Sequence, residues 1–194
     1  MKWPRFTIDL PGWAQEYCAT LTAPRLAVTD RMEVAITLSR LNVLHGTGGP
    51  FGAAIFERAT GRFVAPGMNL VVGSHCSVAH AEIVAIMIAQ SVLQTYNLAT
   101  AAGAPYELVA STEPCAMCMG AIPWSGVNSL VCGARDEDAR DVGFEEGDKP
   151  ADWKQGYRSR GIDVQCGVLS KAAAQVLRDY AASGGPIYNA NAME

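Results

Sequence analysis

The chain has 194 residues, of which 49% are hydrophobic and 18% are charged, and its formal net charge is −4. This length and composition predict one globular domain over residues 1–194, and the acidic balance argues against the basic surface that nucleic acids need. No run of about 18 apolar residues predicts a membrane span, and the first residues lack the pattern of a secretory signal. We therefore expect a cytoplasmic protein without a membrane partner.

The segments alternate between helical and extended patterns along the chain. Residues 1–26 carry scattered Pro and Gly without a clear period, which predicts an irregular N-terminal arm. Helices are predicted over 29–45, 79–96, 114–124, 151–160 and 171–182, and strands over 53–57, 63–72, 106–111, 129–134 and 162–169. The first two strands are close enough to form a hairpin, residues 135–150 form a charged loop, and residues 184–194 form a tail.

This alternation predicts a fold class. Five strands interleaved with helices favour a three-layer α/β/α domain, in which helices cover both faces of a five-stranded mixed sheet. The chain shows no internal repeat and no linker long enough to separate two domains. We therefore expect a single domain.

Two short motifs carry the chemistry. The first is Ala79-His80-Ala81-Glu82, and the second is Glu113 to Cys118, with Cys115 and Cys118 one helical turn apart. One imidazole and two thiolates make three zinc ligands, the number found in catalytic sites, whose fourth position is left to water. Glu82 is not needed as a ligand and is placed to carry the proton that the water releases. We expect one Zn²⁺ per chain.

A His-x-Glu motif followed by Pro-Cys-x-x-Cys is the signature of zinc-dependent nucleobase deaminases. Residues 30–180 resemble the cytidine deaminase-like superfamily, and within it the guanine deaminase branch, which lies close to the tRNA adenosine deaminases. The resemblance rests on these two motifs, on Gly49 to Ala53, on Asn69 and on the helix that ends at Trp124. It implies the cytidine deaminase-like fold, with His80, Cys115 and Cys118 as zinc ligands and Glu82 as the proton shuttle.

The resemblance also implies substrate-binding residues. Asn69 matches the family asparagine that hydrogen-bonds the base, and Phe51 and Trp124 would be apolar walls around the ring, although both also fit ordinary core packing. Gly143 to Glu146 resembles a Gly-Phe-Asp-Asp stretch in which an acidic residue handles the departing amino group. Glu stands here in place of Asp, so both Glu145 and Glu146 are candidates, and the spacing from Cys115 favours Glu146.

The implied reaction is hydrolytic deamination of guanine to xanthine and ammonia. Alternative substrates are another amino-substituted ring, such as ammeline or another triazine, cytosine or a pterin, or the adenosine of a tRNA. A zinc-stabilised interaction module is the non-enzyme alternative, and Glu82 argues against it because a structural site has no use for a spare carboxylate. The resemblance also implies a homodimer that exchanges C-terminal segments, with Tyr188 in the tail as part of a lid over the site.

Overall fold

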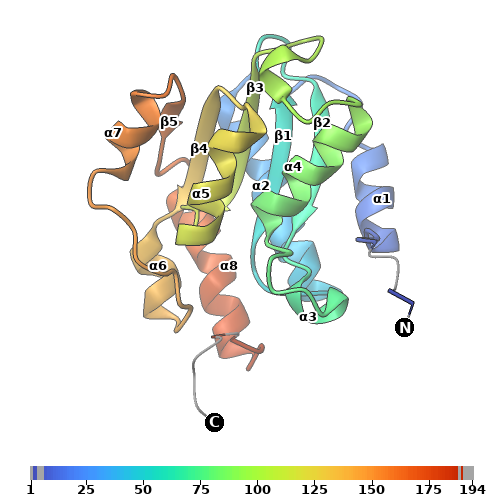
Figure 1. The fold of residues 1–194 in the computed structure, drawn as a ribbon. Coiled ribbons are helices and arrows are strands. Elements are labelled where there is room, and N and C mark those ends of the chain that lie inside the picture. The colour runs from blue at the N-terminus through green and yellow to red at the C-terminus, as the bar shows by residue number, and fades with distance from the viewer. Residues whose placement is uncertain (1, 4–6, 188, 190–194) are drawn as a thin grey trace.

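The computed structural model describes residues 2–3, 7–187 and 189, which form a three-layer α/β/α domain (Figure 1). The strands are β1 (Gly52–Glu57), β2 (Phe63–Met68), β3 (Tyr106–Thr112), β4 (Ser129–Ala134) and β5 (Asp163–Gln165). The α-helices are α1 (Gly12–Ala19), α2 (Val28–Leu44), α3 (Val71–Ser74), α4 (Ala81–Val92), α5 (Ala116–Ser125), α6 (Asp136–Asp141), α7 (Trp153–Arg158) and α8 (Ser170–Ala182). A 3₁₀ helix spans Leu98–Thr100.

The five strands form one mixed sheet in the order β2-β1-β3-β4-β5. The hairpin β1–β2 and the pair β1–β3 are antiparallel, whereas β3–β4 and β4–β5 are parallel. The carboxyl ends of the parallel strands β3 and β4 therefore meet at one edge of the sheet, which is where open α/β sheets bind their ligands. The chain leaves β3 into Glu113 and Cys115 at that edge, and leaves β4 into Asp136.

Both faces of the sheet are buried, because alternate residues of each strand point to opposite sides. In β1, Ala54 and Phe56 lie in the part of the core on the side of α2, whereas Ala53 and Ile55 lie in the part on the side of α4. Figure 1 shows α4 and α5 in front of the sheet and α2 and α8 behind it. The predicted fold class, a five-stranded mixed sheet with helices on both faces, is confirmed.

Four local predictions differ from the structure. The strand predicted over 63–72 ends at Met68, and Val71–Ser74 form the short helix α3, at whose start the side-chain oxygen of Asn69 accepts a hydrogen bond from the N–H of Val71. Residues 12–19 of the arm form α1, in which Pro11 occupies the N-cap position and Trp13 Nε1 donates a hydrogen bond to Thr47 Oγ1 at 3.1 Å. The loop over 135–150 contains α6, whose first turn is acidic, as helix N-termini favour. The last strand is short, because only residues 163–165 of the predicted 162–169 pair with β4.

Among the described residues, none of the helices is both long and apolar enough to cross a membrane.

Candidate functional site

Three side chains from two helix starts converge at the edge of the sheet. His80 is the N-cap residue of α4, Cys115 is the N-cap residue of α5, and Cys118 lies in the first turn of α5. The Nδ1 atom of His80 lies 3.4 Å from Sγ of Cys115 and 3.6 Å from Sγ of Cys118. The structure therefore brings together the three predicted metal ligands.

The position of α4 depends on a glycine in the hairpin. Gly67 of β2 faces the start of α4, and a Cβ atom at this position would collide with the backbone oxygen of Ala81. The absence of a side chain lets the strand and the helix approach closely. The first turn of α4, with His80 before it and Glu82 inside it, is thus held against the sheet.

The position of α5 is set by the turn that precedes it. The backbone N–H of Glu113 donates to the carbonyl of Ala134 at 2.9 Å, which ties the end of β3 to the end of β4. The Glu113 carboxylate forms an ion pair with Lys154 at 3.0 Å. These contacts leave Cys115 at the start of α5, where the positive end of the helix dipole favours a thiolate.

The distances among the ligand atoms fit a tetrahedral zinc ion. Zinc bonds of about 2.3 Å to sulfur and about 2.0 Å to nitrogen place such ligand atoms roughly 3.5 Å apart. All three ligand atoms lie within 4.8 Å of one another, and Cys118 is fully buried. The donor set and its spacing therefore suit zinc.

The protonation states also suit a metal. The hydrogen bond from Cys118, together with the bond and the positive charge of His80, lowers the pKa of the Cys115 thiol to about 4. The same hydrogen bond to Cys115 raises the pKa of the Cys118 thiol, and burial raises it further. Binding of a metal to both sulfurs must therefore release a proton, because zinc binds thiolates.

Glu82 lies beside this cluster and is only 7% exposed. Burial raises the pKa of its carboxyl, and the nearby negative Cys115 adds to the effect. A carboxyl group with a raised pKa exchanges a proton more readily near neutral pH than an ordinary glutamate does. Glu82 thus stands where the sequence places the proton shuttle.

The three-ligand cluster opens into a cavity. Its walls come from the loop before β1, from the segment after β2, from the loop after α6 and from the end of the chain. Gly49, Phe51, Asn69, Val71, Val72, His80, Glu82, Glu113, Cys115, Phe144, Glu145, Glu146, Tyr180, Pro186 and Asn189 line it. Phe51, Asn69 and Glu146, which were predicted as substrate or catalytic residues, are therefore brought to one cavity with two of the metal ligands, His80 and Cys115.

Asn69 is fixed in this wall by a residue that the sequence analysis missed. The side-chain amide of the fully buried Asn42 donates to the backbone oxygens of Asn69 at 2.8 Å and of Gly49 at 2.9 Å. A Cβ on Gly48 would collide with the same Asn69 oxygen, so this approach needs glycine. The side-chain oxygen of Asn69 accepts a hydrogen bond from the N–H of Val71 at 3.3 Å. Asn42 lies in a helical pattern, and that pattern alone gave no sign of this contact.

The two candidate glutamates of the loop after α6 have different environments. The Glu145 side chain is 63% exposed, and its Oε1 accepts a hydrogen bond from the N–H of Gly147 at 2.7 Å. Glu146 is 5% exposed and pairs with Lys149 at 3.1 Å. Burial raises the pKa of Glu146 to about 7, although Lys149 acts in the opposite direction. The buried carboxyl group at this position is therefore Glu146.

Aromatic residues supply an apolar wall that the sequence showed only in part. Phe144 meets Phe51 edge to face, with 4.8 Å between ring centroids, and stacks on Tyr180 at 6.1 Å. Tyr180 belongs to α8, and its hydroxyl donates to the carbonyl of Pro186 at 2.6 Å. Asn189 joins the end of the chain to the loop, because its amide donates to the carbonyl of Gly143 at 2.9 Å. The amphipathic pattern of α8 gave no signal for a role of Tyr180 in the cavity.

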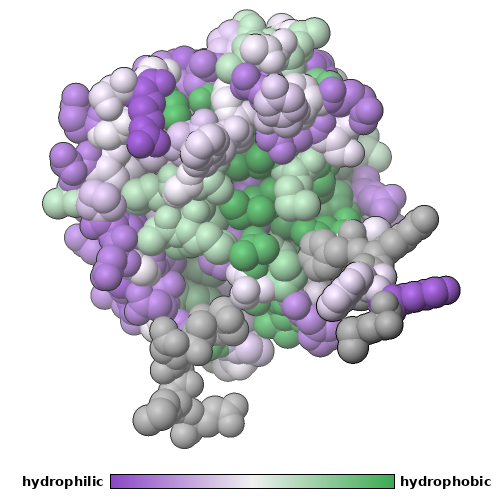
Figure 2. All heavy atoms as spheres, viewed as in Figure 1, coloured by the Kyte–Doolittle hydropathy of each residue, from purple (hydrophilic) through white to green (hydrophobic). Residues whose placement is uncertain are grey.

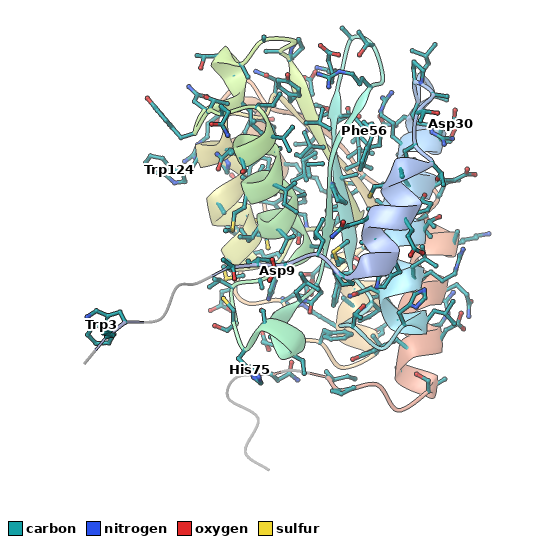
Figure 3. All side chains as sticks on the ribbon, turned by 90° about the vertical axis from the view of Figure 1, so that its right-hand side faces the viewer. Trp3, Asp9, Asp30, Phe56, His75 and Trp124 are labelled. Carbon is teal, nitrogen blue, oxygen red and sulfur yellow. The ribbon has the colours of Figure 1, made fainter. Side chains whose placement is uncertain are left out.

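The prediction that Trp124 forms a wall of the pocket is wrong for the cavity of its own chain. Trp124 lies near the C-terminal end of α5, a helix length from Cys115, and its side chain is 87% exposed. Figure 3 shows this side chain pointing away from the domain. Tyr188, the predicted lid residue, lies outside the described residues.

Comparisons with known proteins agree with this geometry. The model of the family described as cytidine and deoxycytidylate deaminase zinc-binding region matches residues 28–134. A guanine deaminase of Bacillus subtilis is 40% identical over 124 residues, which are 61% of this chain and 75% of that protein. A tRNA-specific adenosine deaminase of Haemophilus influenzae is 32% identical over 133 residues, 68% of this chain and 70% of that protein.

Similarity to a solved structure extends over nearly the whole chain. A solved structure of a guanine deaminase from Nitrosomonas europaea is 44% identical to this chain, with a TM-score of 0.85. The match covers 92% of this chain and 97% of that one. It therefore extends well beyond residue 134, where the family model ends.

Proposed function

This chain belongs to the cytidine and deoxycytidylate deaminase zinc-binding family, and from that premise we propose that it hydrolyses guanine to xanthine and ammonia. The observation that carries the proposal is a pair of buried carboxyl groups, Glu82 and Glu146, on the wall of the cavity that His80 and Cys115 also line. Deamination of an aminated ring moves protons both to a ring nitrogen and to the departing amine. Two acidic groups can divide this work.

His80, Cys115 and Cys118 hold the zinc ion in this proposal. Their spacing suits tetrahedral coordination with one position open. When bound, zinc supplies a Lewis acid that brings the pKa of water down to about 7.

Glu82 is the proton shuttle in this proposal. Its carboxylate accepts a proton from the attacking water and then donates it to the ring nitrogen next to the carbon under attack. Its burial and its raised pKa support this role, because a group that both takes and gives a proton works best with a pKa near the working pH.

Asn69, Phe51 and Phe144 bind the base in this proposal. The amide of Asn69 offers hydrogen-bonding groups to the ring edge, and its backbone is fixed by Asn42. The rings of Phe51 and Phe144, packed edge to face, offer an apolar surface to a flat heterocycle.

Glu146 acts on the exocyclic amine. Its carboxylate accepts a hydrogen bond from the amino group and so orients it. The carboxylate then takes the proton of the hydroxyl that has been added to the ring carbon and passes it to the amine, which leaves as ammonia as the C=O bond forms and the C–N bond breaks. Similarity to guanine deaminases supports the choice of a 2-aminopurine over other rings.

A second candidate function is deamination of adenosine in tRNA. The similarity to a tRNA-specific adenosine deaminase favours it, whereas the net charge of −4 opposes the binding of a polyanion. Ammeline, cytosine and pterins remain alternative free substrates, because the same zinc site and proton shuttle would serve them.

Ammonia release by the zinc-loaded protein tests the proposal. The substrates are guanine, ammeline, cytosine, adenine, guanosine and an unmodified tRNA, at two salt concentrations. We expect guanine to give the highest kcat/KM, with little dependence on salt. Turnover of tRNA alone, falling steeply as salt rises, would establish the second candidate instead.

We further propose a homodimer in the cytoplasm. Met87, Met117 and Trp124 are exposed apolar residues of α4 and α5, and Figure 2 shows apolar surface over these helices. Contiguous apolar surface that is exposed on a single chain can mark an interface between chains. The exchange of C-terminal segments remains a prediction, since Tyr188 and residues 190–194 lie outside the described residues. The cytoplasm is a reducing compartment, which would keep the cysteine ligands reduced and able to bind zinc.

Light scattering after size exclusion tests the dimer. The variant Trp124→Glu should elute as a monomer, because a carboxylate would then be buried in the interface. The control Leu26→Glu changes an exposed leucine of the N-terminal arm and should stay dimeric. A dimeric Trp124→Glu protein would refute this choice of surface.

A further inference from the structure

A buried lysine stands behind the Glu146 carboxylate. The Lys149 side chain is only 9% exposed, and its Nζ atom lies 3.1 Å from Oε2 of Glu146. On its other side the same Nζ pairs with Oδ1 of Asp136, the first residue of α6. Lys149 thus bridges two carboxylates, one of which lines the cavity.

The far end of this bridge is anchored to α6. Asp136 Oδ2 accepts a hydrogen bond from Arg140 Nε at 2.7 Å, one helical turn along α6. Arg140 also donates through Nη2 to the carbonyl of Gly147 at 2.7 Å, in the loop that carries Glu146 and Lys149. Charges therefore alternate from Arg140 through Asp136 and Lys149 to Glu146.

The Glu146 end of this bridge is anchored to α5, the helix whose start carries the metal ligands Cys115 and Cys118. The carbonyl of Glu146 accepts a hydrogen bond from the N–H of Ala116 at 2.9 Å, directly after Cys115. A Cβ on Gly147, which has a φ of +71°, would press on the Cβ of Ala116 at 2.8 Å. The backbone of the loop is thus fastened to the start of α5, and its side chains are fastened to α6.

The ion pair with Lys149 partly compensates the cost of burying the Glu146 carboxylate. A buried carboxylate or ammonium is costly unless it is paired, and loss of one partner leaves the other as an uncompensated charge. Lys149 engages one oxygen of Glu146 and so restrains the carboxylate. Glu146 itself lines the cavity, which leaves its other oxygen for a ligand there.

We propose that Lys149, held by Asp136, is a positioning residue that orients the Glu146 carboxylate toward the exocyclic amine of the base. This inference rests on the proposed function, because it assigns Lys149 an effect only through Glu146. Lys149 is not among the residues that line the cavity. It determines how well the site distinguishes a ring that carries an amine from the same ring without one.

The test compares Lys149→Met, which keeps most of the side-chain length and removes the charge, with the wild type. The matched control is Lys171→Met, at an exposed lysine of α8. Mutation of a residue that orients a metal ligand by a hydrogen bond typically lowers activity about 10- to 100-fold. We expect Lys149→Met to lower kcat/KM for guanine by a similar factor. Competitive inhibition by hypoxanthine, which lacks the 2-amino group, should stay within about threefold of the wild type, since it makes no contact for Glu146 to lose.

A double-mutant cycle tests whether Lys149 affects catalysis through Glu146. If Lys149 acts only through Glu146, the variant Glu146→Gln/Lys149→Met should be no slower than Glu146→Gln alone. A further loss of tenfold or more in the double variant would overturn the proposal. Wild-type kcat/KM in Lys149→Met, or weakening of hypoxanthine inhibition as large as the loss with guanine, would also overturn it.

Two further measurements keep the test decisive. If Lys149→Met lacks the wild-type zinc content and thermal transition, Asp136→Asn replaces it, and wild-type kcat/KM in that variant counts against the proposal. If the wild type deaminates another aminated ring but not guanine, the proposed function fails alone. The same variants are then measured on that ring, with its analogue lacking the amine as the inhibitor.

Discussion

The Sγ atom of Cys115 lies 3.4 Å from Nδ1 of His80, although 35 positions separate the two residues in the chain. Two helix starts, one after the hairpin and one after β3, meet at the edge of the sheet to produce this contact. The distance is that of two ligands on one tetrahedral zinc ion.

Loss of one thiolate should therefore remove the metal. We expect Cys115→Ala to purify with less than about a tenth of the wild-type zinc and without deaminase activity, because only two ligands remain. Zinc content is measured by mass spectrometry of the acid-digested protein. The control Cys18→Ala, in α1, should keep its zinc. Full zinc in the Cys115 variant would contradict the ligand set.

Glu82→Gln should separate chemistry from metal binding. The amide has the shape of the carboxyl group but cannot carry a proton, so we expect kcat to fall by at least about a hundredfold. Zinc content and the thermal transition should match the wild type, since Glu82 is not a required ligand. Ammonia release and metal analysis on one preparation check both statements. Retained turnover would defeat the proposed role of Glu82.

Asn69→Ala should act mainly on binding. Loss of a hydrogen bond to the base in a buried wall is worth about a tenfold rise in KM for guanine, and kcat should change less. Steady-state kinetics measure both constants. Asn97→Ala, which removes the side-chain cap of the 3₁₀ helix, is the control and should keep the wild-type KM. A wild-type KM in Asn69→Ala would exclude a contact with the base.

The Asp136 network predicts acid sensitivity. Burial would raise the pKa of this carboxyl, but hydrogen bonds from Lys149 and Arg140 outweigh burial and lower it below the ordinary 3.8. A lowered folded-state pKa contributes stability above the unfolded pKa, and this contribution is lost as pH falls through the folded pKa.

The wild type should therefore exceed Asp136→Asn in free energy of unfolding near neutral pH, and the difference should shrink from about pH 5 downward. Urea unfolding at a series of pH values measures the difference. A difference that is constant or grows toward acid would contradict the ion pair.

The sequence by itself determined the fold class and the metal ligands. Short apolar runs bounded by breaker and turn residues predicted the five strands, and in the structure the run in β1 divides between the two faces, with Ala54 and Phe56 on one and Ala53 and Ile55 on the other. Cys115 and Cys118 could be paired from their spacing, because residues three apart on a helix share a face. Strands and the spacing of two residues on one helix depend mainly on residues that are close together in the chain, so the sequence records them.

Only the tertiary structure decided which distant side chains meet. The helical pattern gave no sign that Asn42 supports Asn69, and the charged loop gave none that Lys149 is buried between Asp136 and Glu146. Trp124 was expected in the pocket but is exposed, because it lies at the far end of the helix that begins at the ligands. The burial of a charge, or the exposure of an aromatic ring, depends on how segments far apart in the chain pack together, and no local pattern records that packing.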